Sequence, residues 1–267
     1  MANVLSEEIE PGIQRVTLNR PKARNALSPD LLTELRDTMQ RIHKDRGTRV
    51  VILNGAGRGF CAGADLVTGN GLPGTEGMSE LGAVYKFQEY IAETVLAVHE
   101  CEKPVIGAIH GAAVGGGLAI SLACDLRVAA DTAKFGSVFI KVGLSSCDVG
   151  TSYFLPRLVG PARAAELMLT GRHFDAAEAE QMGLVHRVVP EGQEVEAALE
   201  TARAIASNNE YGVWMTKKGM WSNLDAPSLR HAMELENRTQ VLGTFTGNMA
   251  EAMHAFREKR DPNWKPL

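Results

Sequence analysis

Hydrophobic residues in the first half of the chain form short runs whose spacing predicts β-strands. Residues 3–10 and 13–18 alternate in part between apolar and polar side chains and are separated by a Pro-Gly pair, which predicts a β-hairpin. Residues 50–54 and 104–109 are uninterrupted apolar runs, and residues 125–130 have a similar character. Such runs are typical of strands that are buried on both faces. The three runs therefore indicate a buried sheet.

Helical spacing of apolar residues connects these strands and fills the second half of the chain. Residues 25–44 have this spacing, and Ser28 before Pro29 provides an N-cap and a first helical residue. Residues 81–100 and the small-residue segment 117–124 also predict helices. Further helices are expected at residues 161–170, 175–182, 192–208, 212–222, 227–242 and 248–259, with one strand at 184–189. The order of these elements predicts an α/β protein whose last part is helical.

The composition of the 267-residue chain is that of an ordinary globular protein. Hydrophobic residues make up 45% of it and charged residues 22%, so a large core is possible, and we expect one large domain or one domain with a helical appendage. The 28 basic and 32 acidic residues give a formal charge of -4, without the basic excess of a nucleic-acid-binding protein. Small molecules or further copies of the chain are therefore the expected partners, and no nucleic acid.

The N-terminal segment and the cysteines predict a cytoplasmic protein with reduced thiols. The first twelve residues have neither the basic region nor the apolar core of a signal peptide, and no apolar run approaches the roughly 20 residues that span a bilayer. The four cysteines are widely spaced, with no CxxC pair and no histidine at ligand spacing. We therefore expect no membrane association, no disulfide framework and no metal site.

Two glycine-rich turns follow the first two buried runs: GFCAGADL at residues 59–66 and HGAAVGGG at residues 110–117. Small residues let the backbone approach a ligand, and a helix that starts after each turn would direct its free amides and positive dipole end toward the same space. Two amides directed at one oxygen form an oxyanion hole, which needs no side chain. Tight helix packing through glycine explains either turn alone. Nucleotide binding is less well supported, because neither a dinucleotide fingerprint nor a P-loop is present.

Five motifs resemble, in their order along the chain, those of the crotonase superfamily, the enoyl-CoA hydratase/isomerase family. They are NRPKARNALS (19–28), GFCAGADL (59–66), the glycine-rich segment 103–130, AKFG (133–136) and FREKR (256–260). The resemblance covers essentially the whole chain, and the ordered set is far more specific than any one motif. It implies a crotonase-like spiral of ββα turns with a C-terminal helical region.

The same resemblance implies a division of the chain, a substrate class and an assembly. Residues 1–195 would form the ββα spiral core, and residues 196–267 a C-terminal helical trimerisation region. The substrate would be an acyl-CoA thioester, so coenzyme A enters as part of the substrate and no separate cofactor is expected. The assembly would be a homotrimer or a dimer of trimers.

Carried over residue by residue, the resemblance implies that the backbone amides of Ala64 and Gly116 form the oxyanion hole. Other residues would lie along the CoA moiety, with the C-terminal ones often contacting the ligand of a neighbouring subunit: Arg24, Ala62, Asp65, Leu66, Phe256 and Lys259. A solvated charged surface is the alternative interpretation of residues 256–260.

The sequence departs from the family at two positions where a hydratase needs carboxylates. One acid is expected three residues after the oxyanion glycine, and this position is Ala119; the other is expected three residues after the glycine of AKFG, and this position is Phe139. Hydration by two carboxylates requires one acid to deprotonate water and another to handle the α-proton. The usual hydration mechanism is therefore in doubt.

Asp148 is the acid that could replace them. It lies in the segment 142–160, which covers the thioester in relatives, and its context is similar to that of dienoyl-CoA isomerases and of aryl-CoA dehalogenases. An N-cap on the helix that starts near Gly150 is the alternative role. An apolar pocket with Phe139 nearby would raise the pKa of Asp148 and make it a better base.

These observations favour double-bond isomerisation through a thioester enolate, with Asp148 as the proton carrier. Two alternatives stay open: hydrolysis or dehalogenation with Asp148 as nucleophile, and a protein that binds acyl-CoA without turnover. Structural roles are expected for the other reactive side chains near the turns: Cys61, His110, Ser145, Ser146 and Tyr153.

Overall fold

The computed structural model describes residues 2–65 and 75–267 of the chain, and these residues build two sheets. The larger one has the strand order β1-β2-β3-β4-β6-β9, and its only antiparallel pair within the described residues is β1 with β2. Its strands are β1 (Val4–Glu10), β2 (Ile13–Leu18), β3 (Val50–Gly55), β4 (Val105–Ile109), β6 (Leu126–Ala130) and β9 (Arg187–Val189). The smaller sheet is formed by β5 (Ala112–Val114), β7 (Lys134–Gly136) and β8 (His173–Asp175).

The chain passes repeatedly from the larger sheet to the smaller one. β4 leads into β5, and β6 leads into β7, while Cys61, after β3, forms an isolated bridge with Ala113 of β5. A helix or a loop then returns the chain to the next strand of the larger sheet. This arrangement is the predicted spiral of ββα turns, and it brings the ends of β3 and β4 side by side.

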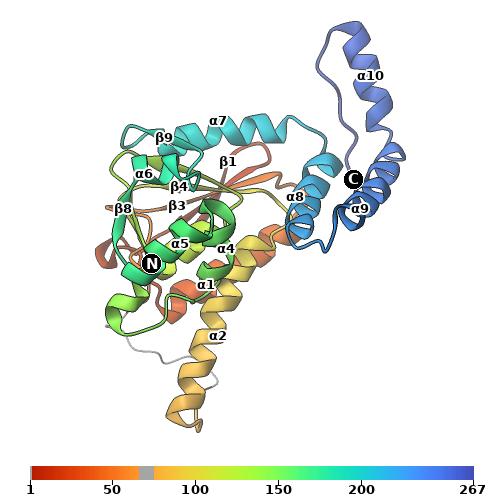
Figure 1. Cartoon of the computed structure of the whole chain (residues 1–267). Helices are drawn as coiled ribbons and strands as arrows, with labels where there is room; N and C mark the ends of the chain where they lie inside the picture. Colours follow the sequence, from red (N-terminus) through yellow and green to blue (C-terminus); the bar gives the residue numbers. More distant parts are fainter. Residues whose placement is uncertain (1, 66–74) are drawn as a thin grey trace.

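Seven helices of the described residues surround the sheets and three more extend from them, as Figure 1 shows. The first group is α1 (Pro29–Lys44), α2 (Glu80–His99), α3 (Gly116–Ala123), α4 (Thr151–Val159), α5 (Pro161–Thr170), α6 (Ala176–Gln181) and α7 (Glu194–Ala206). The second is α8 (Glu210–Leu224), α9 (Leu229–Thr244) and α10 (Asn248–Glu258). Two short 3₁₀ helices are η1 (Pro21–Ala23) and η2 (Val138–Val142).

Most of the predicted elements are confirmed. The hairpin, the three buried strands and the predicted helices are present, and Ser28 Oγ accepts a hydrogen bond from the Leu31 amide at the start of α1. The strand expected over 184–189 is shorter, Arg187–Val189. The sequence pattern missed the three strands of the smaller sheet, because three residues are too few to show a period.

The larger sheet is buried on both faces, which explains its continuous apolar runs. In β3, Val51 and Leu53 belong to a core formed with α1, α2 and α3, whereas Val50 and Ile52 belong to a core formed with α7. Successive side chains of a strand point to opposite faces, so every position of such a strand must be apolar. The 195/196 boundary expected from the resemblance falls within α7, which packs on this sheet.

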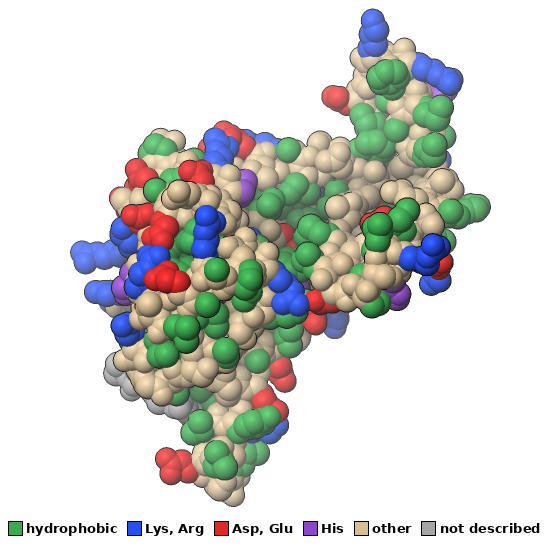
Figure 2. Space-filling model, in the orientation of Figure 1, with side chains coloured by type: hydrophobic (Ala, Val, Ile, Leu, Met, Phe, Trp, Pro, Cys, Tyr) green, Lys and Arg blue, Asp and Glu red, His purple; other side chains and the backbone are tan. Residues whose placement is uncertain are grey.

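Helices α8–α10 expose much apolar surface and are attached to the body by a small polar network. No side chain of α8 or α9 is fully buried, and Figure 2 shows hydrophobic side chains over these helices and in the hollow beside them. Asp125 provides one point of attachment: it accepts hydrogen bonds from Trp221 Nε1 (3.1 Å) and the Val105 amide (2.8 Å) and pairs with Lys217 (2.7 Å). Asp225, after α8, provides another through Tyr153 and Arg157. Within the described residues, no helix is long and apolar enough to cross a membrane.

Candidate active site

The two glycine-rich turns lie against each other at the ends of β3 and β4. The Cys61 amide donates a hydrogen bond to the Ala112 carbonyl (2.8 Å), and the Val114 amide donates one to the Cys61 carbonyl (3.1 Å). A Cβ atom at Gly117 would lie 2.2 Å from the Cys61 carbonyl oxygen, so a larger residue does not fit there. The close approach of the two backbones therefore depends on glycine.

The backbone nitrogens of Ala64 and Gly116 lie close together. A Cβ atom added to Gly116 would lie 3.9 Å from the Ala64 nitrogen, and one added to Gly63 would lie 3.4 Å from the Gly116 nitrogen. Neither amide donates a hydrogen bond to any acceptor in the part of the chain that the structure describes. Gly116 is also the first residue of α3, whose positive dipole end adds to the two donors. The pair is suited to hold an oxyanion.

Backbone hydrogen bonds fix the segment that carries Ala64. The Ala62 amide donates to the Arg24 carbonyl (3.0 Å), and the Asp65 amide donates to the Leu27 carbonyl (3.2 Å). The side chain of Asp65 pairs with Arg20 at 2.9 Å. Three residues expected along the CoA moiety, Arg24, Ala62 and Asp65, are thus brought next to Ala64. The fourth, Leu66, lies outside the described residues, as does any helix that starts between residues 66 and 74.

The Asn25 side chain forms hydrogen bonds with the turn that follows β3. It is buried and donates hydrogen bonds to the carbonyls of Ala56 (2.9 Å) and Gly59 (2.8 Å), while its oxygen accepts one from the Arg20 amide (2.8 Å). Its φ of 55° lies in the left-handed region, which asparagine tolerates better than most residues. Asn25 therefore holds the turn after β3 in place.

The two positions at which the resemblance led us to expect acids, Ala119 and Phe139, carry buried apolar side chains. Ala119 is fully buried in α3, and its amide donates to the Gly115 carbonyl (3.1 Å). Phe139 lies in η2, with its Cε1 atom 3.9 Å from the position of a Cβ on Gly115. Neither side chain can exchange a proton.

Asp148 lies just before α4, and its carboxylate does not cap that helix. The N-cap position is Gly150, and the Thr151 amide donates to the Asp148 backbone carbonyl (2.7 Å) rather than to its side chain. The carboxylate instead accepts a hydrogen bond from Nε2 of Gln88. Burial raises the pKa of Asp148 above its ordinary value, and the hydrogen bond from Gln88 and the nearby Val149 amide partly oppose that effect.

Helix packing relates Asp148 to the glycine turns. Helix α3, which begins at Gly116, packs against both α2 and α4. Gln88 belongs to α2, and Asp148 directly precedes the turn into α4. The hydrogen bond between Gln88 and Asp148 thus joins α2 to the turn before α4, and both of these helices pack on α3.

The other reactive side chains near the turns have structural partners. Burial raises the pKa of Cys61 to about 12, and its thiol donates to the Asn25 carbonyl (3.1 Å). Nε2 of His110 lies 3.0 Å from the Gly57 carbonyl oxygen. The Tyr153 hydroxyl donates to Asp225 (2.5 Å) on the loop after α8. These contacts agree with the structural roles expected from the sequence.

Comparisons with known proteins identify the family and support the fold described above. The family described as Enoyl-CoA hydratase/isomerase matches residues 8–266. The chain belongs to the enoyl-CoA hydratase/isomerase family. "Probable enoyl-CoA hydratase EchA12" of Mycobacterium tuberculosis is 39% identical over 260 residues, 97% of this chain and 91% of that protein. The 1,2-epoxyphenylacetyl-CoA isomerase of Escherichia coli is 32% identical over 264 residues, 99% of each chain. A crystal structure of a probable enoyl-CoA hydratase/isomerase from Mycobacterium abscessus superposes with a TM-score of 0.93 at 39% identity, covering 99% of each chain.

Membership of the enoyl-CoA hydratase/isomerase family confirms the predicted family, the crotonase fold and an enzyme of this class.

Two residues expected to contact CoA are not near the turns in a single chain. Phe256 is 85% exposed on α10, and Lys259 ends that helix with a φ of 54°. In Figure 1, α10 stands away from the body that carries the turns.

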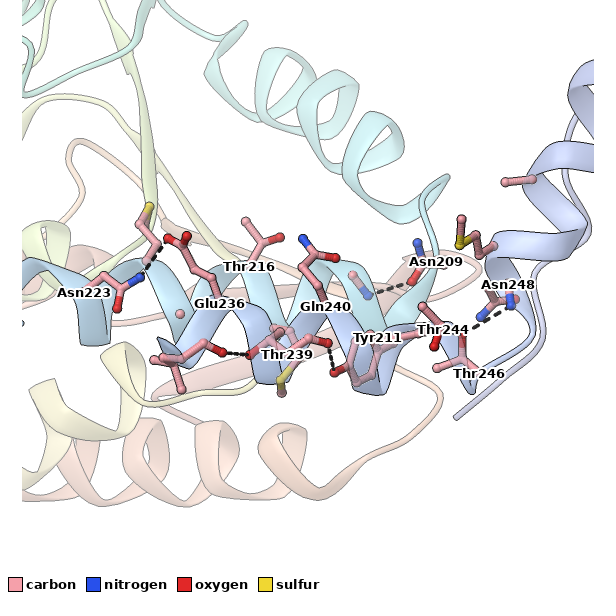
Figure 3. Close-up of a pocket in the computed structure, with 18 of the residues that line it drawn as sticks. Asn209, Tyr211, Thr216, Asn223, Glu236, Thr239, Gln240, Thr244, Thr246 and Asn248 are labelled. Carbon is pink, nitrogen blue, oxygen red and sulfur yellow. Dashed lines mark hydrogen bonds between the residues drawn. The ribbon is translucent and has the colours of Figure 1, made fainter. Parts of the chain in front are cut away.

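A cavity of about 740 Å³ between α8, α9 and α10 is separate from the candidate active site. Figure 3 shows that several of its polar side chains pair with each other or with backbone. Tyr211 donates to the Thr239 carbonyl (2.7 Å), and Asn223 donates to Glu236 (3.1 Å). No residue expected at the site lines this cavity. Among residues 2–65 and 75–267, no group of three or more His, Cys, Asp or Glu side chains is placed to hold a metal ion.

Sequence reasoning missed Gln88 as a partner of Asp148 and Arg20 as a partner of Asp65. Gln88 lies 60 residues from Asp148 and has no local pattern that would reveal the contact. Arg20 could have been named from the sequence, because it belongs to the first motif, NRPKARNALS (19–28).

Proposed function

We propose that the protein shifts the double bond of an enoyl-CoA thioester by proton transfer through an enolate. The observation that carries the proposal is that the backbone nitrogens of Ala64 and Gly116 lie close together, and that neither donates a hydrogen bond within the described residues. Such a pair stabilises the negative charge that develops on a thioester oxygen. The acyl-CoA class of substrate follows from the family.

The chemistry requires one base. The Asp148 carboxylate removes a proton from the carbon next to the thioester, and the electrons of that C–H bond form a new C=C bond. The thioester oxygen becomes negatively charged and accepts hydrogen bonds from Ala64 and Gly116. Return of the same proton to a carbon further along the acyl chain restores the thioester and moves the double bond. No water is consumed, and no electron donor is needed.

The side chains beside the hole favour this reaction over hydration. A hydratase needs a second carboxylate to activate water, but Ala119 and Phe139 are buried and apolar. The names of the relatives do not decide between the two reactions, because the M. tuberculosis protein is named a hydratase and the E. coli protein an isomerase. The proposal therefore depends on Asp148.

Replacement of the proposed base tests the function. Turnover is first measured by chromatography on a panel of 2-enoyl-, 3-enoyl- and dienoyl-CoA thioesters, with binding measured by calorimetry. We expect Asp148→Asn to bind the best substrate as the unchanged protein does and to lose about 10²- to 10⁴-fold in kcat, because amides do not accept the substrate proton. Asp37→Asn, an exposed change on α1, is the control and should keep full activity. Full activity of Asp148→Asn, or no binding by any thioester, would contradict the proposal.

The pH dependence has a defined direction. Only the charged carboxylate acts as a base, and burial raises the pKa of Asp148. We therefore expect kcat to fall as the pH is lowered through a value above the ordinary pKa of aspartate. A pH–rate profile with no acid limb above that ordinary value would count against Asp148 as the base.

Isotopic water distinguishes the nucleophilic alternative. If Asp148 attacks the acyl group, a single turnover in H₂¹⁸O leaves ¹⁸O in the Asp148 carboxylate, which peptide mass spectrometry detects. If Asp148 only transfers a proton, product forms and the carboxylate stays unlabelled. Tight binding of thioesters with no product would instead indicate a binding protein.

We also propose the remaining contacts and the assembly that the resemblance implies. Arg24, Ala62 and Asp65 of one chain would lie along the CoA moiety, and Phe256 and Lys259 would reach it from a neighbouring chain. The exposed apolar surface of α8–α10 supports a homotrimer or a dimer of trimers, with residues 196–267 as its trimerisation region. A cytoplasmic location remains the prediction of the sequence.

A further inference from the structure

Gln88 approaches Asp148 from a helix that is firmly attached to the body. On either side of it along α2, Phe87 and Ile91 are buried in the core. The next turn is joined to α1, because the Tyr90 hydroxyl lies 2.7 Å from Thr33 Oγ1. The side chain of Gln88 is exposed, but its backbone is thus held on both sides. The backbone of Gln88 is therefore held in place, and its side chain extends from a fixed point toward Asp148.

The segment that carries Asp148 is held by an unusual backbone conformation. Val149 has a φ of 35°, although it is β-branched, and its side chain is buried. A β-branched residue in this region is strained, and such strain persists only where surrounding contacts enforce it. Gly150 follows with a φ of 85°, and its Cβ would lie 2.9 Å from the Phe154 ring. This turn presents the Asp148 carboxylate toward α2.

The hydrogen bond between Nε2 of Gln88 and Oδ1 of Asp148 joins these two fixed elements. The charged neighbours of Gln88 on α2, Lys86 and Glu89, pair with each other at 2.6 Å. The titratable residue directly before Asp148 in the chain is Cys147, whose side chain is exposed. The Gln88 amide is thus the side-chain donor that the structure shows on this carboxylate within its described residues.

We propose that Gln88 is a positioning residue for the reaction: its side-chain amide orients the Asp148 carboxylate for proton transfer and stabilises its charged form. This inference rests on the proposed function, in which Asp148 is the base. It adds a residue on α2 to the machinery, and it explains how a carboxylate that is partly removed from water stays ionised.

Two substitutions at residue 88 and a matched control test the inference on the full-length protein. Gln88→Leu keeps a side chain of similar size and removes the hydrogen-bond donor. Loss of a hydrogen bond to a charged group corresponds to about a 10- to 100-fold effect. We expect kcat to fall by this factor and KM to change by less than about threefold. The acid limb of the pH–rate profile should move to higher pH, because the charged form of Asp148 loses a partner. Gln88→Glu places a like charge beside Asp148 and should move the limb further in the same direction. Gln40→Leu, the same change at an exposed position of α1, should alter neither kcat nor the limb.

The outcomes separate this inference from the function on which it rests. Gln88 is exposed, so both variants should melt within a few degrees of the unchanged protein, which the experiment checks first. If Asp148→Asn abolishes turnover while Gln88→Leu keeps the original kcat and acid limb, the positioning role is wrong and the proposed function stands. If Asp148→Asn keeps full activity, or if no thioester is turned over, both are overturned.

Discussion

Gly116 and Gly117 are neighbours that must be glycine for different reasons. A Cβ on Gly117 would lie 2.2 Å from the backbone oxygen of Cys61, which cannot move without separating the two turns. A Cβ on Gly116 would meet only the end of the Leu27 side chain, at 2.8 Å, but would stand 3.9 Å from the Ala64 nitrogen. Gly117 thus allows the turns to pack, and in the proposed function Gly116 would leave room for a ligand oxygen.

Alanine substitutions should separate these two roles. Gly116→Ala should remain folded, because a side-chain terminus can shift, and should lose about 10²-fold in kcat as its methyl group obstructs the oxyanion. Gly117→Ala should lower the melting temperature strongly, since a backbone atom blocks the methyl group. Thermal melts followed by circular dichroism and kcat on the best thioester provide the measurements. Gly116→Ala with unchanged kcat would exclude the space between the amides as the oxyanion site.

The residues of the site differ in how far the sequence could reveal them. The glycine-rich turns after the buried runs indicated an oxyanion hole, and the family resemblance then implied the amides of Ala64 and Gly116. The contact between Gln88 and Asp148 could not be predicted, because it joins positions 60 residues apart and depends on how α2 lies against the turn before α4. Local chemistry is encoded locally, whereas the partner of a catalytic group depends on the tertiary structure.

Among the elements, α3 begins at Gly116, whose amide we propose for the oxyanion hole, and is anchored at its other end. Arg127 is buried in β6, and its guanidinium donates hydrogen bonds to the carbonyls of Ser121 (3.2 Å), Leu122 (3.4 Å) and Cys124 (2.7 Å). It also donates to the Leu184 carbonyl (2.6 Å). Burial lowers the pKa of Arg127, and the negative dipole end of α3 compensates in part for the missing carboxylate partner. The arginine is therefore the C-terminal anchor of α3.

Removal of this anchor should destabilise the protein. Arg127→Met removes the guanidinium donor from four buried carbonyls, of which Ser121 keeps a hydrogen bond from the Cys124 amide (3.3 Å), and we expect a loss of about 2–4 kcal/mol in the free energy of unfolding. Arg187→Met is the matched control: its side chain is half exposed and pairs only with Glu200 (2.6 Å), an interaction worth about 0–1 kcal/mol. Urea unfolding at equal protein concentration compares the two. Equal stability of both variants would show that the buried hydrogen bonds do not anchor the helix.

Element prediction succeeded for the long strands and for the helices, including the helices that project from the body, and failed for the strands of three residues. The runs in β3 and β4 are apolar throughout because α7 covers one face of the sheet and α1–α3 cover the other. The strands β5, β7 and β8 were missed because three residues show no period. In α2 the helical spacing was correct, but Leu81 is 79% exposed, since the N-terminal part of the helix extends beyond the body (Figure 1).

At the scale of the whole molecule, the C-terminal helices are the part whose surface is least explained by a single chain. α8 is attached in part through Asp125 and Lys217, a partly buried ion pair at 2.7 Å, whereas α9 and α10 lie further from the body in Figure 1. Their exposed apolar side chains include Leu229, Met233, Val241, Leu242, Phe245, Met249 and Met253. A surface of this kind usually marks an interface. It is the structural support for the proposed trimer.

Charge substitution on α9 tests that assembly. Light scattering should give the unchanged protein three or six times the 28.8 kDa of one chain. The double variant Leu242→Glu, Phe245→Glu alters side chains that are 61% and 83% exposed, so a single chain should still fold. Burial of two charges in an interface is strongly unfavourable. We therefore expect the measured mass to fall to that of one chain. Leu169→Glu, 74% exposed on α5, should keep the original mass. The separated chains should also bind acyl-CoA more weakly, because Phe256 and Lys259 would no longer reach a neighbour's ligand. A monomeric unchanged protein with full thioester affinity would contradict both the trimer and the contribution of α10 to the site.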